Sequence, residues 1–524
     1  MDSGTCYHAA MQQAPHPSTP DQGPVIAFLG DPRTHGGRAV ERVDTHGAVV
    51  FLAGDRALKL KRAVRFPYMD FSTAERRRAA CEAELRLNRR TAPTLYRGVL
   101  PVVRTPGGVL ALGGEGEVVD WVVDMRRFDG ALLFDRLADR GALTPALMRD
   151  LAEAVAAFHR DAEPRPDGGG AAAMRAVVDG NLEELRQRAD LFDPAVVARL
   201  AALSGAALER HGGLLETRRA GGFVRHCHGD LHLRNIVLLD GRPTLFDGIE
   251  FDESFAVVDV LYDLAFLLMD LDRRGLWDLA NAVFNRYMEL TGDYGGLPLL
   301  PLFLSVRAAV RAKVEAAAAA AQTDAAAVGE RRREAVAYLG HAVAALRPEP
   351  PRLVAVGGLS GTGKTTLARA LAPDLGSPPG ALVLRSDVLR KRLFGRADTE
   401  RLPEEAYAPD VTARVYADIA GRARAALAAG IPVVADAVYA HPEERAAIEA
   451  AAAQAGAPFR GLWLEAALPV RAGRVEGRAA DASDATAAVV RRQEGYDLGS
   501  LGWVRVNAAA NPSEVLAVAR ESLS

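Results

Sequence analysis

The sequence predicts two different folds in one chain, an α+β half followed by an α/β half. In the first half, short β segments precede a long and mostly helical stretch, which indicates a small strand-rich lobe and a larger helical lobe. In the second half, apolar strands alternate with helical patterns, as in βαβ units that build a parallel sheet. Between the halves stands Arg347-Pro-Glu-Pro-Pro351, whose prolines stop a helix and stiffen the chain.

Composition and charge limit the class of protein. The 524 residues are 49% hydrophobic and 25% charged, which allows sizeable cores in two or three domains. The net charge of −3 gives no basic footprint for nucleic acid, and no stretch approaches the roughly 18 consecutive apolar residues of a membrane span. Cys6, Cys81 and Cys227 lack a paired spacing, which fits a reducing compartment. We expect a cytoplasmic protein that binds neither nucleic acid nor membrane, and the sequence indicates no oligomeric state.

The expected domain limits follow from these patterns. Residues 1–24 mix Pro, Gln, His and Asp without an apolar run, so we expect a disordered tail. The first domain is expected over 25–346, the proline-rich linker over 347–351 and the second domain over 352–524.

The first domain is expected to begin with a hairpin. Ala48–Leu52 and Ala57–Lys61 flank a turn, and helical periodicity follows over Ser72–Arg90. The remaining expected elements are a buried strand over 116–125, a helical stretch over 131–163, and helices from the glycine-rich break at 168–170 to about 346, interrupted by short β pieces near 223–225 and 236–251. In the second domain, strands are expected over 353–356, 381–384, 431–435 and 461–464.

A glycine-rich loop with a lysine follows the first strand of the second domain. It has the Walker A pattern in its strand-loop-helix context, with a helix expected from Thr366 to Leu371. The glycines let backbone N–H groups converge on phosphates, Lys364 supplies a point charge, and the Thr365 hydroxyl can bind Mg²⁺. The chain has only five lysines, so a chance match is improbable. The expected nucleotide-binding residues are Gly358, Leu359, Ser360, Gly361, Thr362, Gly363, Lys364, Thr365 and Thr366.

Further polar residues follow the next strands of the second domain. Asp436 ends an apolar strand, where a Walker B aspartate would reach the Mg²⁺ shell, although it could also serve a turn. Asp387 and Arg390 follow the second strand and would face the substrate cleft, with a helix N-cap as the alternative for Asp387. Arg474 and Arg478 stand four apart on an expected helix, as in a lid that closes over phosphate, or on a solvated face.

A second phosphate-transfer pattern lies in the first domain. His228-Gly-Asp230 is followed by Asn235, and then by Leu245-Phe-Asp247-Gly. Kinase-type transfer needs a carboxylate to orient or deprotonate a hydroxyl, together with an amide and a second carboxylate for Mg²⁺. Asp230, Asn235 and Asp247 provide these groups in order.

The two domains resemble two families of phosphate-transferring enzymes. The second domain resembles small P-loop kinases of the nucleoside-monophosphate, gluconate and shikimate kinase type, which implies that Asp387 handles the acceptor and that Arg474 and Arg478 stabilise the transition state. The first domain resembles the bilobal, protein-kinase-like aminoglycoside phosphotransferase and choline kinase superfamily. That likeness implies Asp230 as catalytic base and Asn235 and Asp247 as metal ligands.

The same likeness implies a lysine that reaches the ATP phosphates and pairs with a helix glutamate. Lys59 and Lys61 share one face of a strand, since side chains alternate. We favour Lys61 over Lys59, with Glu84 as the partner. His228 is expected to be a scaffold residue and Asp263 a structural carboxylate. The whole arrangement is similar to the bacterial family called bifunctional aminoglycoside phosphotransferase/ATP-binding proteins.

Two features depart from these families. The region around Val43–Gly47 has no Gly-x-Gly loop to cover phosphates. An aminoglycoside pocket would need a dense acidic lining, and we expect the candidates Asp252, Glu253 and Asp270 to be solvated surface groups instead.

The function expected from the sequence is that of a Mg-ATP-dependent phosphotransferase with two nucleotide sites. Each would transfer the γ-phosphate of ATP to a small hydroxyl-bearing metabolite. One alternative is a single catalytic domain regulated by nucleotide binding to the other domain. Another alternative is a toxin-like kinase that acts on a sugar nucleotide.

Overall fold

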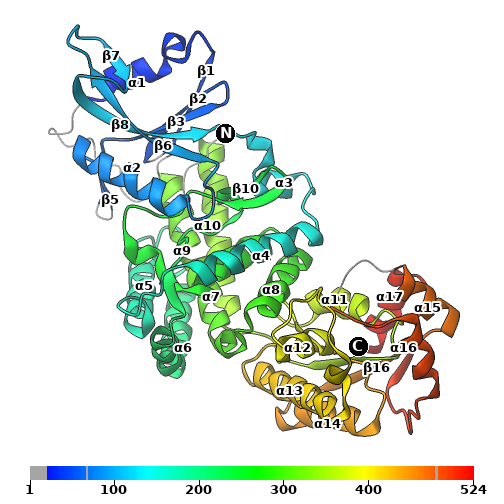
Figure 1. The fold of residues 1–524 in the computed structure, drawn as a ribbon. Coiled ribbons are helices and arrows are strands. Elements are labelled where there is room, and N and C mark those ends of the chain that lie inside the picture. The colour runs from blue at the N-terminus through cyan, green and yellow to red at the C-terminus, as the bar shows by residue number, and fades with distance from the viewer. Residues whose placement is uncertain (1–20, 46, 67–68, 321, 478–481, 524) are drawn as a thin grey trace. The chain divides into compact units, whose positions relative to one another are not determined.

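The structure, a computed structural model, describes residues 21–45, 47–66, 69–320, 322–477 and 482–523, so most of the expected tail lies outside the described residues. The chain forms two compact units (Figure 1). Unit 1 ends its first stretch at Arg274 and resumes over Leu299–Leu346, and unit 2 combines Gly275–Pro298 with the chain from Arg347 onward. The sequence-based division places Gly275–Pro298 in the first domain, whereas in the structure it packs within unit 2.

The small lobe of unit 1 is built on an antiparallel sheet. Its strand order is β1-β2-β3-β8-β6-β7, and the expected hairpin is present, with Ala48 opposite Lys61. Because side chains alternate along a strand, Leu58 and Leu60 of β3 enter the core on one face while Lys59 and Lys61 point to the other. The strands are β1 (Val40–Asp44), β2 (Ala48–Ala53), β3 (Arg56–Lys61), β6 (Tyr96–Arg104), β7 (Leu110–Leu112) and β8 (Glu117–Arg126).

The helix α2 (Ala74–Asn88) packs against β8 and β6 of this sheet. Thr73 caps its N-terminus by accepting from Arg76 N–H. One face of α2 is buried and contributes Cys81 to the apolar core under the sheet. The same helix carries two buried polar residues, Glu84, which contacts Lys59 of β3, and Asn88, which accepts a hydrogen bond from Gly248 N–H.

The rest of unit 1 is mainly helical. Its centre is α7 (Val260–Arg273), which is buried through most of its length and packs on α9. The other helices are α1 (Gly23–Gly30), α3 (Phe134–Asp139), α4 (Pro145–Asp161), α5 (Gly170–Arg186), α6 (Pro194–Ala220), α9 (Leu300–Ala320) and α10 (Ala325–Ala345). Two small antiparallel pairs, β9 (Val224–His226) with β12 (Val257–Asp259) and β10 (Ile236–Leu239) with β11 (Arg242–Leu245), frame the His228–Asn235 loop. The remaining short pair is β4 (Arg65–Phe66) with β5 (Met69–Asp70).

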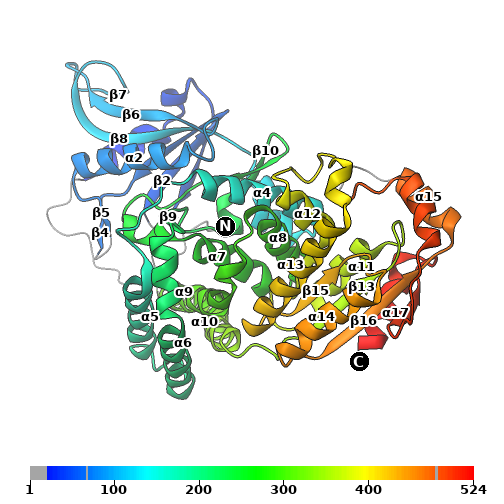
Figure 2. The same cartoon turned by 60° about the horizontal axis from the view of Figure 1, so that its bottom comes forward.

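Unit 2 contains a parallel five-stranded sheet of order β14-β15-β13-β16-β17. The four expected strands are confirmed as β13 (Leu353–Gly357), β14 (Leu382–Arg385), β15 (Val433–Asp436) and β16 (Phe459–Glu465), and β17 (Val504–Asn507) adds an edge that the sequence analysis did not anticipate. Helices α11 and α17 share a core cluster on one face, and α13 and α14 cover the other (Figure 2). The helices of unit 2 are α8 (Trp277–Thr291), α11 (Lys364–Leu371), α12 (Ser386–Leu393), α13 (Pro409–Ala428), α14 (Pro442–Gln454), α15 (Leu468–Glu476), α16 (Ala487–Arg492) and α17 (Pro512–Leu523).

Among the described residues, none of the helices combines the length and the apolar character that crossing a membrane would require.

Candidate active sites

The His228–Asn235 loop buries a carboxylate at its centre. Asp230 is 2% exposed, and its Oδ2 accepts a hydrogen bond of 2.9 Å from Asn235 Nδ2. Its Oδ1 is buried without a hydrogen-bond partner among the described residues. Burial opposes ionisation of Asp230, but the neighbouring imidazole of His232 lowers the pKa of Asp230 below its usual range. The loop therefore holds an ionised carboxylate with one oxygen available to a ligand.

Asp263 of α7 binds the backbone of this loop. It accepts hydrogen bonds from the backbone N–H groups of His228 at 3.2 Å and Gly229 at 2.8 Å, and its Oδ2 lies 3.1 Å from His159 Nε2. Although burial opposes ionisation, the hydrogen bond with His159 lowers the pKa of Asp263 to about 2. Gly229 has φ +82°, a conformation that disfavours a side chain. Asp263 therefore fixes the backbone that carries Asp230.

The two lysines of β3 make different contacts. Lys59 Nζ lies 2.8 Å from Glu84 Oε1 and 2.6 Å from Asp247 Oδ1. Lys61 Nζ lies 2.5 Å from Glu84 Oε2 and also pairs with Glu250. The side chain of Lys61 is 3% exposed, whereas that of Lys59 is 15% exposed. Only Lys59 thus joins Glu84 to Asp247, and Lys61 is enclosed between two carboxylates.

Asp247 is held in an unusual backbone conformation. Its φ is +60°, which costs free energy for a residue other than glycine and occurs most often at functional positions. Tyr96 Oη accepts from Asp247 N–H at 3.2 Å, and Asn88 Oδ1 accepts from Gly248 N–H at 2.8 Å. Burial would raise the pKa of Asp247, but Lys59 lowers it. The sequence analysis did not identify Tyr96, Asn88 or Glu250, because isolated polar residues on a strand or helix carry no spacing signal.

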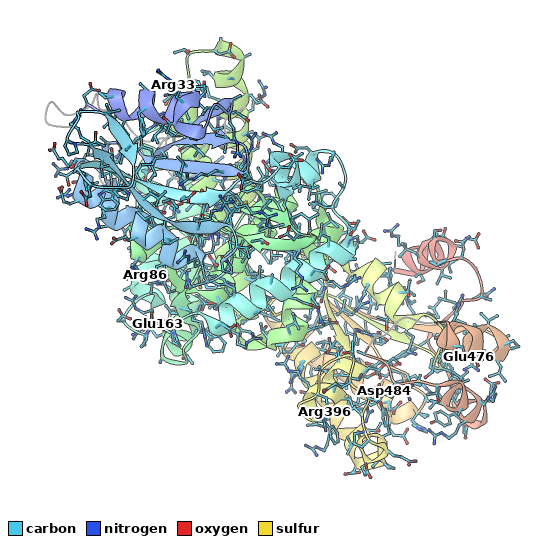
Figure 3. The ribbon with its side chains drawn as sticks, turned by 45° about the horizontal axis from the view of Figure 1, so that its top comes forward. Arg33, Arg86, Glu163, Arg396, Glu476 and Asp484 are labelled. Atoms are coloured by element: carbon cyan, nitrogen blue, oxygen red, sulfur yellow. The ribbon has the colours of Figure 1, made fainter. Side chains whose placement is uncertain are left out.

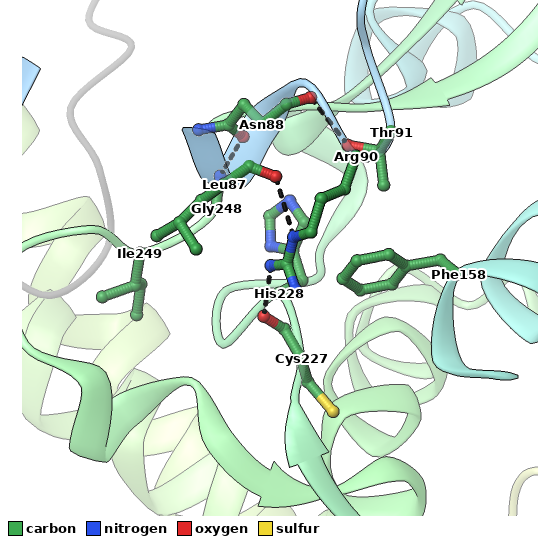
Figure 4. Close-up of a pocket in the computed structure, with 9 residues that line it drawn as sticks. All are labelled: Leu87, Asn88, Arg90, Thr91, Phe158, Cys227, His228, Gly248 and Ile249. Atoms are coloured by element: carbon green, nitrogen blue, oxygen red, sulfur yellow. Dashed lines mark hydrogen bonds between the residues drawn. The ribbon is translucent and has the colours of Figure 1, made fainter. Parts of the chain in front are cut away.

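A small pocket lies behind the loop and is lined by residues from both lobes of unit 1 (Figure 4). Arg90 crosses it and donates hydrogen bonds to the main-chain oxygens of His226 at 2.7 Å and Cys227 at 3.3 Å, while its guanidinium lies 5.0 Å from the centre of the Phe158 ring. The volume open to the centre of a water molecule is about 10 Å³, which suits a single water molecule. This pocket is too small for a substrate.

The acidic candidates near this site have structural partners. Asp270 is buried and accepts hydrogen bonds from Leu233 N–H at 3.0 Å and from Arg274 Nε at 3.2 Å. The expectation of a solvated Asp270 is therefore wrong, since it anchors the loop to α7. Asp252 accepts from Ser254 N–H, and the exposed Glu253 pairs with Arg165 at 3.0 Å.

In unit 2 the glycine-rich loop connects β13 to α11. Gly358, Gly361 and Gly363 have φ of +140°, +85° and +93°, which suits glycine alone. A Cβ atom on Gly361 would lie 2.5 Å from the main-chain oxygen of Arg471, so this position also needs the smallest residue. Thr362 is buried and donates to Leu359 O at 2.8 Å. The loop is thus held in one compact shape.

The N-terminus of α11 brings the charged and hydroxyl groups of the motif together. The helix begins at Lys364 and has no side-chain cap, so the first amides of α11, those of Lys364, Thr365 and Thr366, are typical anion-binding groups. Lys364 Nζ donates to Leu359 O at 3.2 Å. Thr365 Oγ1 donates to Asp436 Oδ2 at 2.6 Å. The hydroxyl and the carboxylate expected to bind Mg²⁺ are therefore in direct contact.

Asp387 and Arg390 both lie on α12. The alternative that Asp387 is an N-cap is wrong, because the helix begins at Ser386 and Asp387 lies within its first turn. Burial raises the pKa of Asp387, Asp436 adds to this, and Arg385 and Lys364 oppose it. Arg390 is bound to the main-chain oxygen of Ala406 at 2.6 Å, which leaves less of it available to a substrate than the sequence analysis expected.

The arginines expected to form a lid fall partly within the described residues. Arg474 of α15 is exposed and its Nη1 lies 3.4 Å from Thr362 O of the glycine-rich loop. Arg478 lies outside the described residues. Beyond that gap, Asp484 (labelled in Figure 3) accepts from Tyr407 Oη at 2.7 Å and from Leu402 N–H at 3.0 Å. The sequence analysis also missed Gln493, whose Oε1 accepts from Ser360 N–H at 2.7 Å.

Comparison with known proteins matches the two parts of the chain to two different families. Residues 45–300 match the model of the phosphotransferase enzyme family, and residues 353–496 match that of an AAA domain family. The fold and the sites thus define a fusion of a kinase-like phosphotransferase domain with a P-loop domain.

Two mycobacterial relatives match most of the chain. A protein of Mycobacterium tuberculosis and one of Mycobacterium bovis, both uncharacterised, are each 32% identical over 468 residues, which cover 87% of this chain and 90% of the relative. The chain belongs to the family of bifunctional aminoglycoside phosphotransferase/ATP-binding proteins.

Among solved structures, a choline/ethanolamine kinase family protein from Mesorhizobium loti is 16% identical and covers 62% of this chain and 98% of its own, with a TM-score of 0.36. A gluconokinase from Sinorhizobium meliloti is 22% identical and covers 33% of this chain and 94% of its own, with a TM-score of 0.24.

Proposed function

We propose that the protein is a Mg-ATP-dependent phosphotransferase with two nucleotide sites, each of which transfers the γ-phosphate of ATP to a small hydroxyl-bearing metabolite. The observation that carries the proposal is a contact, in each unit, between a carboxylate and a polar group of a phosphate-transfer pattern: an ammonium group in unit 1 and a hydroxyl group in unit 2. Lys59 contacts Asp247 in unit 1, and Thr365, which follows Lys364 at the start of α11, contacts Asp436 in unit 2.

The residues of unit 1 fit a divalent cation. Asp247 is ionised and lies close to the buried Asp230, whose Oδ1 has no hydrogen-bond partner among the described residues. Carboxylate and amide oxygens are the ligands that Mg²⁺ prefers. Asn235 and Asp247 would hold the ion; ATP would supply the phosphoryl group, and Mg²⁺ would supply positive charge that offsets the negative charge of the phosphate oxygens.

In unit 1, Asp230 would act on the acceptor. Its carboxylate is ionised at neutral pH and its unpartnered Oδ1 would accept the hydrogen bond of the attacking hydroxyl group. Asp230 would then take the proton as the acceptor oxygen bonds to the γ-phosphorus and the bond from that phosphorus to the bridging oxygen of ATP breaks, which releases ADP. Asp263 and Asn235 keep this carboxylate in place, which is the preorganisation that transfer requires.

Lys59 is the lysine that we assign to the phosphates of this site. It is the more exposed of the two β3 lysines and is the one that contacts Asp247. Lys61 would set the position of Glu84, which in turn orients Lys59. This reverses the preference drawn from the sequence, in which Lys61 came first.

In unit 2, the glycine-rich loop from Gly358 would enclose the phosphates, with Lys364 as the mobile charge. Thr365 and Asp436 would hold Mg²⁺. Asp387, whose raised pKa suits a group that exchanges protons, would accept the proton of the acceptor hydroxyl. Arg474, together with Arg478, would neutralise charge on the transferring group.

The full-length protein and its Asp230→Asn and Lys364→Ala variants test the proposal. Each would be incubated with labelled ATP and panels of sugars, nucleosides and amino alcohols. We expect two separable activities, with each substitution removing one and leaving the other within about twofold, because the two sites lie in separate compact units. Binding of nucleotide without any phosphorylated product would contradict the proposal. Loss of a single activity in both variants would instead favour one catalytic unit regulated by the other.

A further inference from the structure

Helix α8 belongs to unit 2 although its sequence lies within the residues that match the phosphotransferase family. Its buried face includes Val283, Phe284 and Tyr287. The segment after it is also bound there, since Arg392 of α12 donates to the main-chain oxygen of Thr291 at 2.8 Å and the guanidinium of Arg422 lies 4.6 Å from the Tyr294 ring centre. The helix is therefore an integral part of this unit.

Two asparagines of α8 complete the open edge of the sheet at β14. Asn285 Oδ1 accepts from Val383 N–H at 2.7 Å, and Asn285 Nδ2 donates to Ala381 O at 3.1 Å. Asn281 Nδ2 donates to Ala381 O at 3.1 Å and to Pro379 O at 2.8 Å. The amide side chains thus satisfy the groups that a neighbouring strand would satisfy. This contact fixes the register of α8 against β14.

One helical turn beyond Asn285, a carboxylate of α8 reaches the residue that ends β14. Glu289 is 7% exposed at its side chain, and its Oε1 lies 3.7 Å from Arg385 Nη1. Its other oxygen lies 3.3 Å from Arg286 Nη1, and Arg286 also pairs with Asp398. Glu289 is therefore held between two guanidinium groups.

Arg385 joins this group to the glycine-rich loop. Its Nε lies 3.7 Å from Asp436 Oδ2, the same oxygen that accepts the 2.6 Å hydrogen bond of Thr365. The side chain of Arg385 is 2% exposed, so solvent screens these charges little. One buried guanidinium therefore lies near two carboxylates, that of Glu289 at its Nη1 and that of Asp436 at its Nε.

We propose that Glu289 is a positioning residue of the P-loop site, which holds Arg385 at a distance from Asp436 that leaves this carboxylate able to bind Mg²⁺. The inference rests on the nucleotide site proposed above and adds a residue to it from outside the 352–524 segment. With Glu289 neutral, Asp436 and Asp387 would still attract Arg385, and a direct pair with Asp436 would compete with the metal ion for the same oxygens. A helix encoded among the residues of the first family thus sets the metal affinity of the second.

The test measures nucleotide binding by the full-length protein and not its activity. A fluorescent ATP analogue would be titrated at a series of Mg²⁺ concentrations and in EDTA. The difference in bound analogue between the wild type and Lys364→Ala would give the binding that belongs to the P-loop site. For Glu289→Gln we expect the Mg²⁺ concentration that gives half-maximal binding at the P-loop site to rise by about 10- to 100-fold. Binding of the analogue in EDTA should stay within twofold of wild type. Asp278→Asn, the same change of charge at an exposed position of α8, is the control.

A double substitution distinguishes a positioning role of Glu289 from a general loss of structure. In an Arg385→Met background, Glu289→Gln should no longer change the Mg²⁺ dependence, because Glu289 acts only through Arg385. If this double variant does not fold, Glu289→Asp, which keeps the charge, should restore most of the affinity lost in Glu289→Gln.

The same binding measurements distinguish failure of the role of Glu289 from failure of the proposed nucleotide site. Equal weakening of binding with and without Mg²⁺ would mean a structural role and would overturn the inference, as would an unchanged Mg²⁺ dependence in Glu289→Gln. If Lys364→Ala leaves binding intact, the proposed nucleotide site itself fails, whatever Glu289 does.

Discussion

Lys59 donates a hydrogen bond of 2.6 Å to Asp247, although 188 positions of the chain separate the two residues. Lys59 also contacts Glu84 of α2. One ammonium group thereby connects a strand and a helix of the small lobe to the loop that follows β11. This contact distinguishes Lys59 from Lys61, which lies between Glu84 and Glu250.

Substitution of the two lysines should separate catalysis from stability. Lys59→Ala should reduce kcat/KM at the unit 1 site by about 10²–10³-fold, the usual cost of one charge-stabilising donor. Lys61→Ala should chiefly lower stability, by about 3–5 kcal/mol, because it leaves Glu84 and Glu250 buried without this partner. Steady-state kinetics and thermal unfolding of both variants provide the measurement. A larger catalytic loss in Lys61→Ala, with its stability intact, would show that the assignment of Lys59 is incorrect.

Substitution of Asp387 should have opposite effects on activity and stability. An acid whose pKa is raised on folding binds more protons in the native state, so stability is lost as pH rises from the usual value of 3.8 through the raised one. At neutral pH this cost is fully present. Asp387→Asn should therefore raise the unfolding midpoint at pH 7 but not at pH 3, and should slow the unit 2 reaction by about 10²–10⁴-fold.

The opposite stability result would contradict that reasoning. If Asp387→Asn lowers the unfolding midpoint at pH 7, the carboxylate is stabilised by Arg385 and Lys364 more than burial destabilises it. The nearby exposed Glu405→Gln, on the segment before α13, serves as the control, and its midpoint should not change.

Gly361 should not tolerate even a methyl group. Its φ of +85° would cost about 1–2 kcal/mol for alanine, and the added Cβ would meet Arg471 O at 2.5 Å. Gly361→Ala should therefore weaken nucleotide binding at least about tenfold, equivalent to 1.4 kcal/mol. Gly473→Ala on α15 meets no atom within 4 Å and should bind nucleotide normally with stability slightly increased. Equal binding by both variants would contradict the role of the loop.

The two asparagines of α8 should act as one unit. Asn285→Ala leaves Val383 N–H without its partner, which should cost about 1–3 kcal/mol. Because Asn285 Nδ2 also donates to Asn281 Oδ1 at 2.9 Å, the double variant should be less destabilised than the sum of the single variants. Thermal unfolding of the four proteins in the cycle measures this coupling, and strict additivity would contradict it.

Much of the architecture was predictable because it has a local cause. The β13 strand followed by glycines and Lys364 predicts a P-loop from spacing alone, and alternation along Leu58–Lys61 places both lysines on one face. Spacing could not choose between Lys59 and Lys61, since that choice depends on how far each reaches toward Asp247. Asn88 and Tyr96 were also missed, since a buried polar residue shows its role only through its distant partner.

The assignment of α8 was unpredictable for a different reason. Its apolar face at Val283, Phe284 and Tyr287 indicates a helix that packs on something, but the sequence does not say on what. Residues 275–298 precede further helices of unit 1, so continuity along the chain favours the first domain. Asn281 and Asn285 identify the true neighbour only once β14 is present beside them.

The return of the chain from α8 to unit 1 bears on how these two halves are inherited. In a simple tandem fusion, one cut in the gene separates two complete proteins. Here the polypeptide passes between the units after Arg274, after Pro298 and after Leu346. A gene fragment that starts at residue 352 would encode a sheet whose β14 edge is free to recruit strands from other molecules. Selection against that aggregation would keep the halves together, even in a lineage that needed only one of them.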